Sequence, residues 1–553
     1  MIILELLVFL VGIIFLSLSF SGLGSLFTLK LKSDFFLDIF CGLIITSLIV
    51  TFVHFFFKIN FIIAGGIFLI GIILFFLKKN ISIFPEKKDL FLYFIILFSL
   101  LPIFISQKYH EDFGYYHLPY SLAFIEEKIV FGFANIDIPY VYNSIWLNLY
   151  PIFFIENKNF DFLTLPSFLL FLSFIIFSIR NIIKRKDQIK NSDYYLVVTL
   201  FYFLLKFTRL SEFGVDFPAI IFSALSIYYF IKFYETEENL EKETFFYFNV
   251  TFSIFSILIK LSMAIVIILP IYLYFSNFKN MKFYIFSFKF LIIIFLCLIF
   301  FIQQFIYTGC LLFPTNLTCL NVSWFSSDNL DLSKKIELIN KSYSLAKDIY
   351  SPEEYLSNFN WFLFWIKRNS VEIMEHLLTM TLPLLIFVFV LKKRSKIHVI
   401  FKERLILALF VALGFLFWLN YSPVLRFAIH IFITLVFLFF SSILFSREFS
   451  KKKFLIFISV FLIFSFSKNI LRINNTEMLF LGIQKIENEY ILNNKISNKY
   501  ANIYYPDIKR NNKNGWQGRL CWNTPFICSY NKLDVSKKNG YLVVNKLKTD
   551  HDR

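Results

Sequence analysis

The chain has 553 residues, of which 58% are hydrophobic and 17% are charged, with a formal net charge of +17 and a mean hydropathy of +0.67. A soluble domain is nearer to about half apolar and a quarter charged, so this composition excludes an ordinary soluble protein. The Lys and Arg residues lie mostly in short segments between apolar runs, which is typical of cytoplasmic loops and gives no reason to expect nucleic-acid binding.

Apolar runs recur along the chain at about the 17–25 residues that a helix needs to cross a bilayer. The sequence therefore predicts an all-α polytopic membrane protein. The first run, Ile2–Phe20, lacks a basic leader and a small-residue cleavage site, so we expect a retained helix. The predicted helices lie near 2–20, 35–57, 60–77, 90–105, 161–179, 194–207, 217–233, 245–259, 261–275, 283–307, 374–391, 403–419, 424–446 and 453–467.

Four loops between these helices are rich in Lys and Arg, and the predicted helix order places all four on one side of the membrane. We expect this side to be cytoplasmic. Both termini and the polar segments 106–160, 208–216, 308–373 and 468–553 then lie outside. The basic residues concerned are Lys78, Lys79, Lys87 and Lys88, then Arg180, Lys184, Arg185, Lys186 and Lys190, then Lys392, Lys393, Arg394, Lys396 and Lys402, then Arg447, Lys451, Lys452 and Lys453.

The outer segments carry some secondary structure of their own. We expect soluble helices over Asp331–Tyr350 and from Pro352 to Phe364. Hydropathy falls after residue 467, which divides the chain into a transmembrane module, 1–467, and a small outer segment, 468–553. That segment is predicted to be α/β, with an amphipathic helix over Ile473–Lys499 and short strands at Ile503–Tyr505 and Tyr541–Val544.

Segment 106–160 opens with a dense cluster of ionisable and aromatic side chains, and we interpret it as the active-site segment of a membrane enzyme. Charged side chains next to a bilayer are costly unless they are solvated, ion-paired or part of a functional site. Asp112 or Glu111 suits a general base or a ligand for a substrate hydroxyl, and nearby donors and stacking surfaces suit sugar or phosphate. The alternative is a solvated loop with interfacial tyrosines. The candidate binding residues here are Tyr115, Tyr116, His117 and Trp146.

Three further places combine charge with apolar surroundings. The corner Arg209–Pro218 holds Arg209, Glu212 and Asp216, which form either a second acidic site or a local ion pair that fixes the turn. Lys260 interrupts an apolar stretch, and Arg426 follows Pro423 at a helix start. Both cations suit a lipid-borne phosphate, with snorkelling to ordinary headgroups as the alternative.

Cysteines and metal ligands give two weaker indications. Cys310 with Cys319, and Cys521 with Cys528, are close pairs in outer segments, which favours disulfides over free thiols or zinc. His110 and His117 with the acids would suit a divalent ion, but they form no compact ligand motif. We therefore expect no metal and no other cofactor, and the chain contains no Walker, GxGxxG, GxSxG or HExxH motif.

Taken in order, these motifs resemble the GT-C superfamily of membrane glycosyltransferases, which includes protein O-mannosyltransferases and lipid A aminoarabinose transferases, and more closely a bacterial branch of such proteins. The residues that carry the resemblance are Asp112-Phe-Gly-Tyr115-Tyr116-His117-Leu-Pro119, Asn143-Ser144-Ile145-Trp146, Ser211-Glu212-Phe-Gly-Val-Asp216-Phe-Pro218, Ile259-Lys260-Leu261-Ser262, Thr308-Gly309-Cys310-Leu-Leu-Phe-Pro314 and Cys521-Trp522-Asn523-Thr524-Pro525-Phe-Ile-Cys528. One departure is the order Glu111-Asp112, where such enzymes often carry Asp-Glu.

The resemblance implies a GT-C-like bundle in a bacterial inner membrane with periplasmic loops, a periplasmic C-terminal segment and both termini in the periplasm. It implies inverting transfer of a sugar from a polyprenyl-phosphate donor to a glycan, lipid or protein acceptor in cell-envelope assembly. Asp112 would be the base, Asp216 a secondary acid, and Lys260 or Arg426 a partner of the donor phosphate. The alternatives are a transporter, flippase or glycan polymerase, and a non-catalytic envelope assembly protein.

Overall fold

The structure, a computed structural model, describes residues 2–29, 31, 33–77, 87–105, 112–154, 163–184, 189–206, 214–278, 287–393, 401–445, 447–475, 494–506 and 520–547. Within these residues, nine helices are long and apolar enough to cross a membrane, and three shorter apolar helices accompany them. The chain is an α-helical, multi-pass membrane protein, as the composition predicts.

The first half of the bundle consists of α1 to α9. Its helices are α1 (Ile2–Thr28), α2 (Phe35–His54), α3 (Phe61–Leu77), α4 (Lys87–Ile105), α5 (Leu118–Glu126), α6 (Leu165–Lys184), α7 (Asn191–Lys206), α8 (Asp216–Glu235) and α9 (Asn239–Ile259). Short turns of π or 3-10 helix flank α5, namely η1 (Phe113–His117), η2 (Phe133–Asn135), η3 (Ile138–Val141) and η4 (Leu147–Phe153).

The second half contains the remaining helices and the strands. They are η6 (Leu261–Ile267), α10 (Ile268–Ser276), α12 (Phe288–Thr308), η8 (Asn316–Thr318), α13 (Asp328–Asn340), η9 (Tyr343–Leu345), α14 (Pro352–Leu356), α15 (Asn360–Val390), α16 (Phe401–Tyr421), η10 (Leu425–Ala428), α17 (Ile429–Phe445) and α18 (Lys451–Asn475), with strands β1 (Lys392–Lys393), β2 (Arg447–Glu448), β3 (Lys495–Ser497), β4 (Asn502–Tyr504), β5 (Leu533–Lys538) and β6 (Tyr541–Lys546). The strands form three antiparallel two-stranded sheets, and single bridges join Phe131 to β6 and Cys528 to β4.

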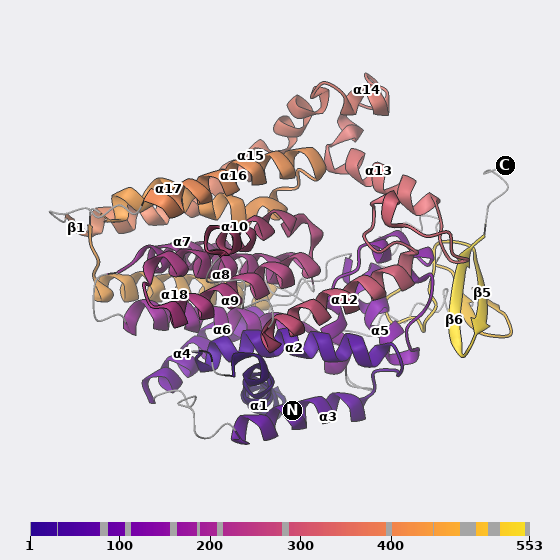
Figure 1. Cartoon of the computed structure of the whole chain (residues 1–553), viewed down its shortest axis with the longest axis horizontal. Coiled ribbons are helices and arrows are strands. Elements are labelled where there is room, and N and C mark those ends of the chain that lie inside the picture. Colours follow the sequence, from indigo (N-terminus) through magenta and orange to yellow (C-terminus); the bar gives the residue numbers. More distant parts are fainter. Residues whose placement is uncertain are drawn as a thin grey trace.

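Most helices lie roughly along the long axis, with α15, α16 and α17 above, α7, α8 and α9 in the middle, and α2 and α3 below (Figure 1). Small residues let the first helices approach closely. A Cβ at Gly24 would meet the Asp38 carbonyl and one at Gly42 would meet the Phe20 carbonyl, so α1 and α2 run antiparallel with touching backbones. Close packing through small residues is typical of helices in membranes.

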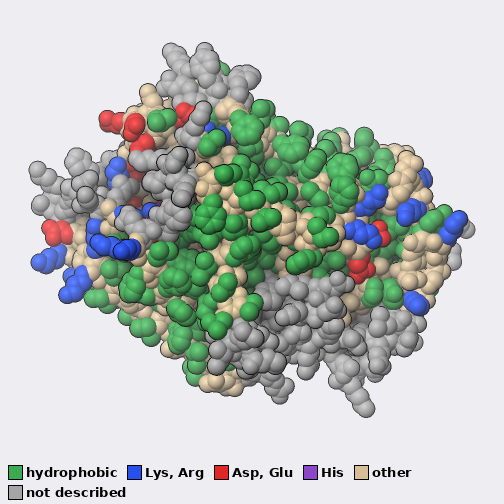
Figure 2. Space-filling view, turned by 90° about the horizontal axis from the view of Figure 1, so that it is seen from below, with side chains coloured by type: hydrophobic (Ala, Val, Ile, Leu, Met, Phe, Trp, Pro, Cys, Tyr) green, Lys and Arg blue, Asp and Glu red, His purple; other side chains and the backbone are tan. Residues whose placement is uncertain are grey.

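The described Lys and Arg residues of the four basic loops lie at one end of the bundle. Lys87, Arg180 and Lys451 lie at the end where α4 and α18 begin and α6 ends, beside the β1–β2 pair. Figure 2 shows hydrophobic side chains over the middle of one face, with Lys and Arg gathered toward its ends. The described part of all four basic loops therefore shares one end of the bundle, which we call the basic end.

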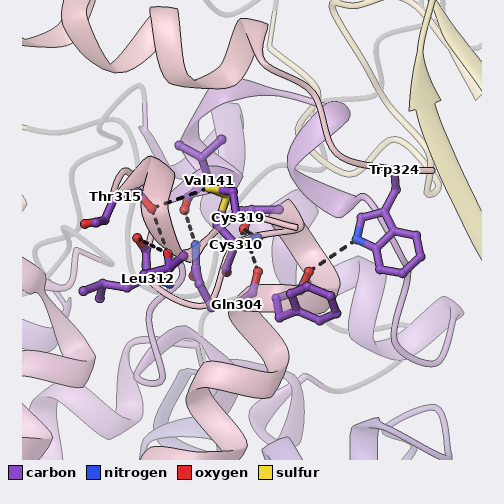
Figure 3. Close-up of a disulfide and its surroundings, with 10 residues drawn as sticks. Val141, Gln304, Cys310, Leu312, Thr315, Cys319 and Trp324 are labelled. Atoms are coloured by element: carbon purple, nitrogen blue, oxygen red, sulfur yellow. Dashed lines mark hydrogen bonds between the residues drawn. A yellow bond between two sulfur atoms is a disulfide. The ribbon is translucent and has the colours of Figure 1, made fainter. Parts of the chain in front are cut away.

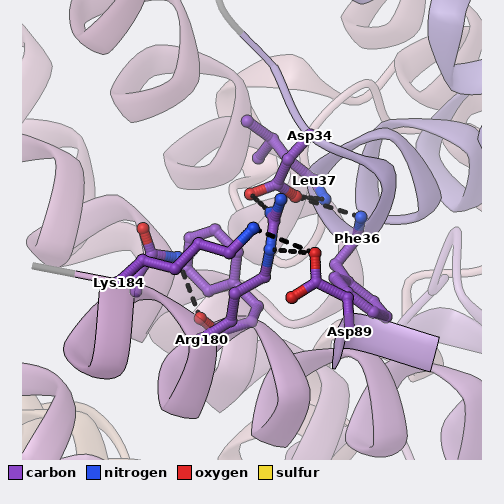
Figure 4. A network of polar contacts seen from close by, with 8 residues as sticks. Asp34, Phe36, Leu37, Asp89, Arg180 and Lys184 are labelled. Atoms are coloured by element: carbon purple, nitrogen blue, oxygen red, sulfur yellow. Dashed lines mark hydrogen bonds and ion pairs between the residues drawn. The ribbon is translucent and has the colours of Figure 1, made fainter. Parts of the chain in front are cut away.

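An ion-pair network ties three helix ends together at the basic end. Arg180 contacts Asp34 (2.7 Å) and Asp89 (3.0 Å), and Lys184 also contacts Asp89 (3.0 Å). Figure 4 shows these side chains converging between α2, α4 and α6, where Asp34 also caps α2 by accepting from the Phe36 and Leu37 N–H groups. The Asp89 side chain is only 5% exposed, so removing either cation would leave a buried carboxylate without full compensation.

At the opposite end, segment 112–154 folds into the bundle and does not form an open loop. Asn148 donates to Thr51 of α2 (2.7 Å) and to Gln303 of α12 (3.0 Å), and Asn143 also donates to Gln303 (2.9 Å). Tyr120 in turn donates to Asn148 (2.7 Å). These buried amides are hydrogen-bonded as burial requires, and they anchor the segment to the spanning helices.

Several predicted boundaries are wrong. The helix predicted to start at 374 begins at Asn360, after a break at Ser357–Phe359 where Phe359 has a φ of 59°. The helix predicted over Asp331–Tyr350 ends at Asn340. The amphipathic helix predicted over Ile473–Lys499 is wrong at its end, where β3 lies, and its centre falls outside the described residues. Beyond α18, the described part of 468–553 contains the strands β3 to β6, which agree with the predicted strands near Ile503 and Tyr541.

Candidate functional site

A cavity of about 860 Å³ lies among α7, α8, α15 and α18, reaching the end of the bundle opposite the basic end. Sequence-distant segments meet around it. The lining residues with ionisable or hydroxyl groups are Asp112, Tyr116, His117, Ser167, Tyr202, Lys206, Asp216, Lys260, Glu372, Glu375, His376, Thr379, Arg426, Lys468 and Arg472.

Six of the predicted site residues line this cavity, and we call four of them, Asp112, Asp216, Lys260 and Arg426, the Asp216 cluster. Each sits where a helix starts or breaks. Asp112 directly precedes η1, Asp216 is the first residue of α8, and Lys260 separates α9 from η6. Arg426 lies in η10, the turn that follows Pro423. Helix ends at one end of the bundle therefore gather charges that are far apart in the sequence.

Asp216 joins the two cations of this cluster. Its Oδ2 accepts from Arg426 Nε at 2.8 Å, and its Oδ1 contacts Lys260 Nζ. Lys260 also lies over the Phe427 ring, 3.4 Å from its centroid. The Lys260 and Asp216 side chains are 18% and 23% exposed, whereas Arg426 is 51% exposed. A guanidinium has four N–H groups besides Nε, so Arg426 retains donors for a ligand in the cavity.

Asp112 and Tyr116 face the same charges. Asp112 is close enough to Asp216 and to Lys260 to interact with both electrostatically. Burial, followed by the negative charges of Asp112 and Asp216, raises the pKa of the Tyr116 hydroxyl well above its ordinary value. Tyr116 therefore remains a neutral phenol that can donate a hydrogen bond, and His117 lines the cavity beside it.

Two predicted binding residues lie elsewhere. Trp146 is fully buried and packs against Phe222 and Phe255, away from the cavity lining. Tyr115 turns toward Asp137 and Tyr530, with its ring centroid 5.5 Å from that of Tyr530. Both residues shape the outer segment, and neither is among the residues that line the cavity.

A second charged group lines the same cavity and was not predicted. We call Lys206, Glu372, Glu375, His376, Lys468 and Arg472 the α18 cluster. Lys206 Nζ lies 2.5 Å from Glu375 Oε1, and Lys468 is close enough to interact with the same carboxylate. Tyr202 and His376 share a hydrogen bond of 2.8 Å between the hydroxyl and Nδ1.

The spacing of these residues could have revealed the α18 cluster. Glu372 and His376 are four positions apart on α15, and Lys468 and Arg472 are four positions apart on α18. Residues at this spacing share one helix face. The predicted helices stopped at 467 and began at 374, so the helical register of these charges went unnoticed.

One wall of the cavity is apolar and continuous with the outer surface of the bundle. Leu378 and Leu382 of α15 and Phe464 of α18 line the cavity, and they are 53%, 53% and 46% exposed. In a membrane protein, exposed apolar side chains on spanning helices face lipid. The cavity therefore joins a charged end to a lipid-facing side.

Both predicted disulfides are formed. Cys521 is bonded to Cys528 with an S–S distance of 2.05 Å, and Cys310 to Cys319 with 2.11 Å. Figure 3 shows the second bond beside Gln304, which donates to the Val141 carbonyl at 2.8 Å. Both lie at the end of the bundle that carries the Asp216 cluster.

Three predicted site residues, Glu111, Arg209 and Glu212, lie outside the described residues, as does His110. Among the residues that are described, no group of three or more His, Cys, Asp or Glu side chains is placed to hold a metal ion. The Asp216 cluster consists instead of paired carboxylates and cations.

Comparison with known proteins gives a family but no activity. No curated protein and no solved structure matches the chain significantly. Residues 1–433 match the family described as "Domain of unknown function (DUF8201)". This match covers every member of the Asp216 cluster and ends before α18. Because it spans well over half of the chain, the protein belongs to the DUF8201 family.

Proposed function

We propose that the protein is a membrane glycosyltransferase that moves a sugar from a polyprenyl-phosphate donor to an acceptor at the non-cytoplasmic face of a bacterial inner membrane. The observation that carries this proposal is the single cavity that joins Asp112, Asp216, Lys260 and Arg426 to an apolar, lipid-facing wall. A lipid-linked donor needs both parts, because its chain stays in the bilayer while its phosphate and sugar leave the hydrocarbon.

The chemistry follows from the charges. Asp112 accepts the proton of an acceptor hydroxyl while the oxygen of that hydroxyl attacks the anomeric carbon of the donor sugar. A new carbon–oxygen bond forms as the bond to the donor phosphate breaks, and the polyprenyl phosphate departs with the electron pair. Arg426 and Lys260 stabilise the charge that develops on the departing phosphate, which is the role that positioned cations serve in transfer reactions.

Asp216 has a different role from Asp112 in this proposal. It contacts both Lys260 and Arg426, so its carboxylate holds the two cations in place and acts as a positioning residue. Asp112 directly precedes η1, the turn that carries Tyr116 and His117. The donor phosphate would therefore sit against Arg426, with the acceptor hydroxyl toward Asp112.

The test is Asp112→Asn in cells that lack the chromosomal gene. We expect transfer to fall by about 10²–10⁴-fold, since that is what a general base contributes. Mass spectrometry of surface glycans and of accumulated lipid-linked sugars provides the measurement. Asp331→Asn is the matched control, because this carboxylate is 72% exposed at the same end of the bundle and lies outside the cavity.

The same experiment separates the alternatives. If the deletion changes surface glycans while Asp112→Asn restores them fully, Asp112 is not the base. A deletion that traps a complete glycan on the cytoplasmic side favours a flippase. A deletion without any glycan change, together with a stable protein partner, favours an assembly protein.

A further inference from the structure

The α18 cluster has a surplus of positive charge that the Asp216 cluster lacks. It combines three cations, Lys206, Lys468 and Arg472, with two carboxylates, Glu372 and Glu375. The Asp216 cluster combines two cations with two carboxylates, and Asp216 contacts both of its cations. Among the described lining residues, cations outnumber carboxylates on the α7 and α18 side, which favours an anion there.

The α18 cluster also adjoins the apolar wall directly. On α15, Leu378 and Leu382 follow Glu375 by three and seven residues, which places them on the same helix face toward the basic end. On α18, Phe464 precedes Lys468 by four residues, and Lys468 Nζ lies 5.4 Å from the Phe464 ring centroid. Cations above an exposed apolar strip fit a molecule with an anionic head and a hydrocarbon tail.

We propose that the α18 cluster binds the anionic headgroup of a second amphiphile, so that the acceptor of the transfer is itself a lipid carrying a phosphate. This inference rests on the proposed function, in which the donor phosphate occupies the Asp216 cluster. Two phosphate lipids then enter one cavity from the bilayer between α15 and α18. Lys468 and Arg472 hold the acceptor head while its hydroxyl reaches toward Asp112.

The test counts polyprenyl phosphate molecules bound to the purified full chain by native mass spectrometry in a neutral detergent. We expect two equivalents on the wild-type protein. The double variant Lys468→Gln/Arg472→Gln should weaken one equivalent at least tenfold and leave the other unchanged. Lys451→Gln/Lys452→Gln is the matched control, because it removes the same charge from the same helix at the basic end.

The outcomes separate this inference from the proposed function. Unchanged binding of both equivalents in Lys468→Gln/Arg472→Gln overturns the acceptor subsite. If Lys260→Gln/Arg426→Gln keeps both equivalents, the donor site and the proposed function fail instead. Thermal unfolding of each variant shows whether its fold is intact.

Discussion

At the scale of single residues, Asp137 couples the outer segment to pH. Its side chain is buried, it accepts from the Ile138 N–H at 2.7 Å, and it is hydrogen-bonded to Tyr115. Burial raises the pKa of this carboxyl to about 6, although both hydrogen bonds and the charge of Lys546 act in the opposite direction. The folded protein therefore favours the protonated acid more strongly than the unfolded chain does.

This shift predicts the sign of a pH effect. Stability from Asp137 is fully present below the unfolded pKa near 4 and is lost as the pH rises through about 6. A shift of this size corresponds to about 3 kcal/mol. We expect Asp137→Asn to remove that part of the pH dependence in thermal unfolding of the detergent-solubilised protein. Asp534→Asn, at an exposed position in β5, is the control, and equal pH slopes in wild type and Asp137→Asn would contradict the prediction.

Charge type and order in the sequence were enough to propose Asp112, Asp216, Lys260 and Arg426, since each lies at a polar break between apolar runs. The contact of Asp216 with both cations was not predicted, because Arg209 lies nearer in the sequence and was the expected partner of Asp216 or Glu212 in a local ion pair. Trp146 was proposed for binding because it lies in the polar outer segment, yet the packing of Phe222 and Phe255 around it is a property of the tertiary structure alone.

At the scale of elements, the C-terminal hairpins are docked onto the site. The backbone N–H of Trp522 donates to the Gly114 carbonyl at 2.8 Å, and the backbone N–H of Phe526 donates to the Glu126 carboxylate at 2.9 Å. Phe131 pairs with β6 through hydrogen bonds to Leu542 and Val544. The loop around Trp522 and Phe526 therefore holds the turn that carries Tyr116 and His117, while the β5–β6 hairpin pairs with Phe131.

Gly114→Ala should loosen this contact. A Cβ at Gly114 would lie 2.5 Å from the Trp522 ring, so the indole must move. Overpacking of this kind costs about 1–3 kcal/mol. We expect faster proteolysis within residues 520–547 and reduced transfer. Gly65→Ala is the control, because a Cβ there meets nothing within 4 Å, and equal proteolysis rates in the two variants would contradict the docking role.

Hydropathy alone located each spanning helix, because length and apolarity decide that property. It could not locate the start of α15, where the first turns are amphipathic and continue outside the apolar run. An amphipathic pattern also suggested a helix where β3 lies. The strand forms there because β3 pairs with Asn502 and Ile503 across a turn. Helix boundaries and strand pairing depend on contacts with other segments, and the hydrophobic periodicity of one segment carries no information about those contacts.

At the scale of the whole molecule, the basic end predicts the orientation in the membrane. We expect Lys452→Cys to be labelled by a membrane-impermeant maleimide only after the cells are opened. Ile349→Cys, 64% exposed near the opposite end, should be labelled in intact spheroplasts. A Cys297→Ser background removes the partly exposed free thiol, while Cys41 is buried. Labelling of both positions from one side would contradict the orientation.

The docking of residues 520–547 onto segment 112–154 has a consequence for biosynthesis. The two partners are separated by roughly four hundred residues, so a ribosome completes every spanning helix before the second partner emerges. Contacts of such high sequence separation form late. A nascent chain can insert its spanning helices and still lack these contacts, which form only once residues 520–547 have been synthesised.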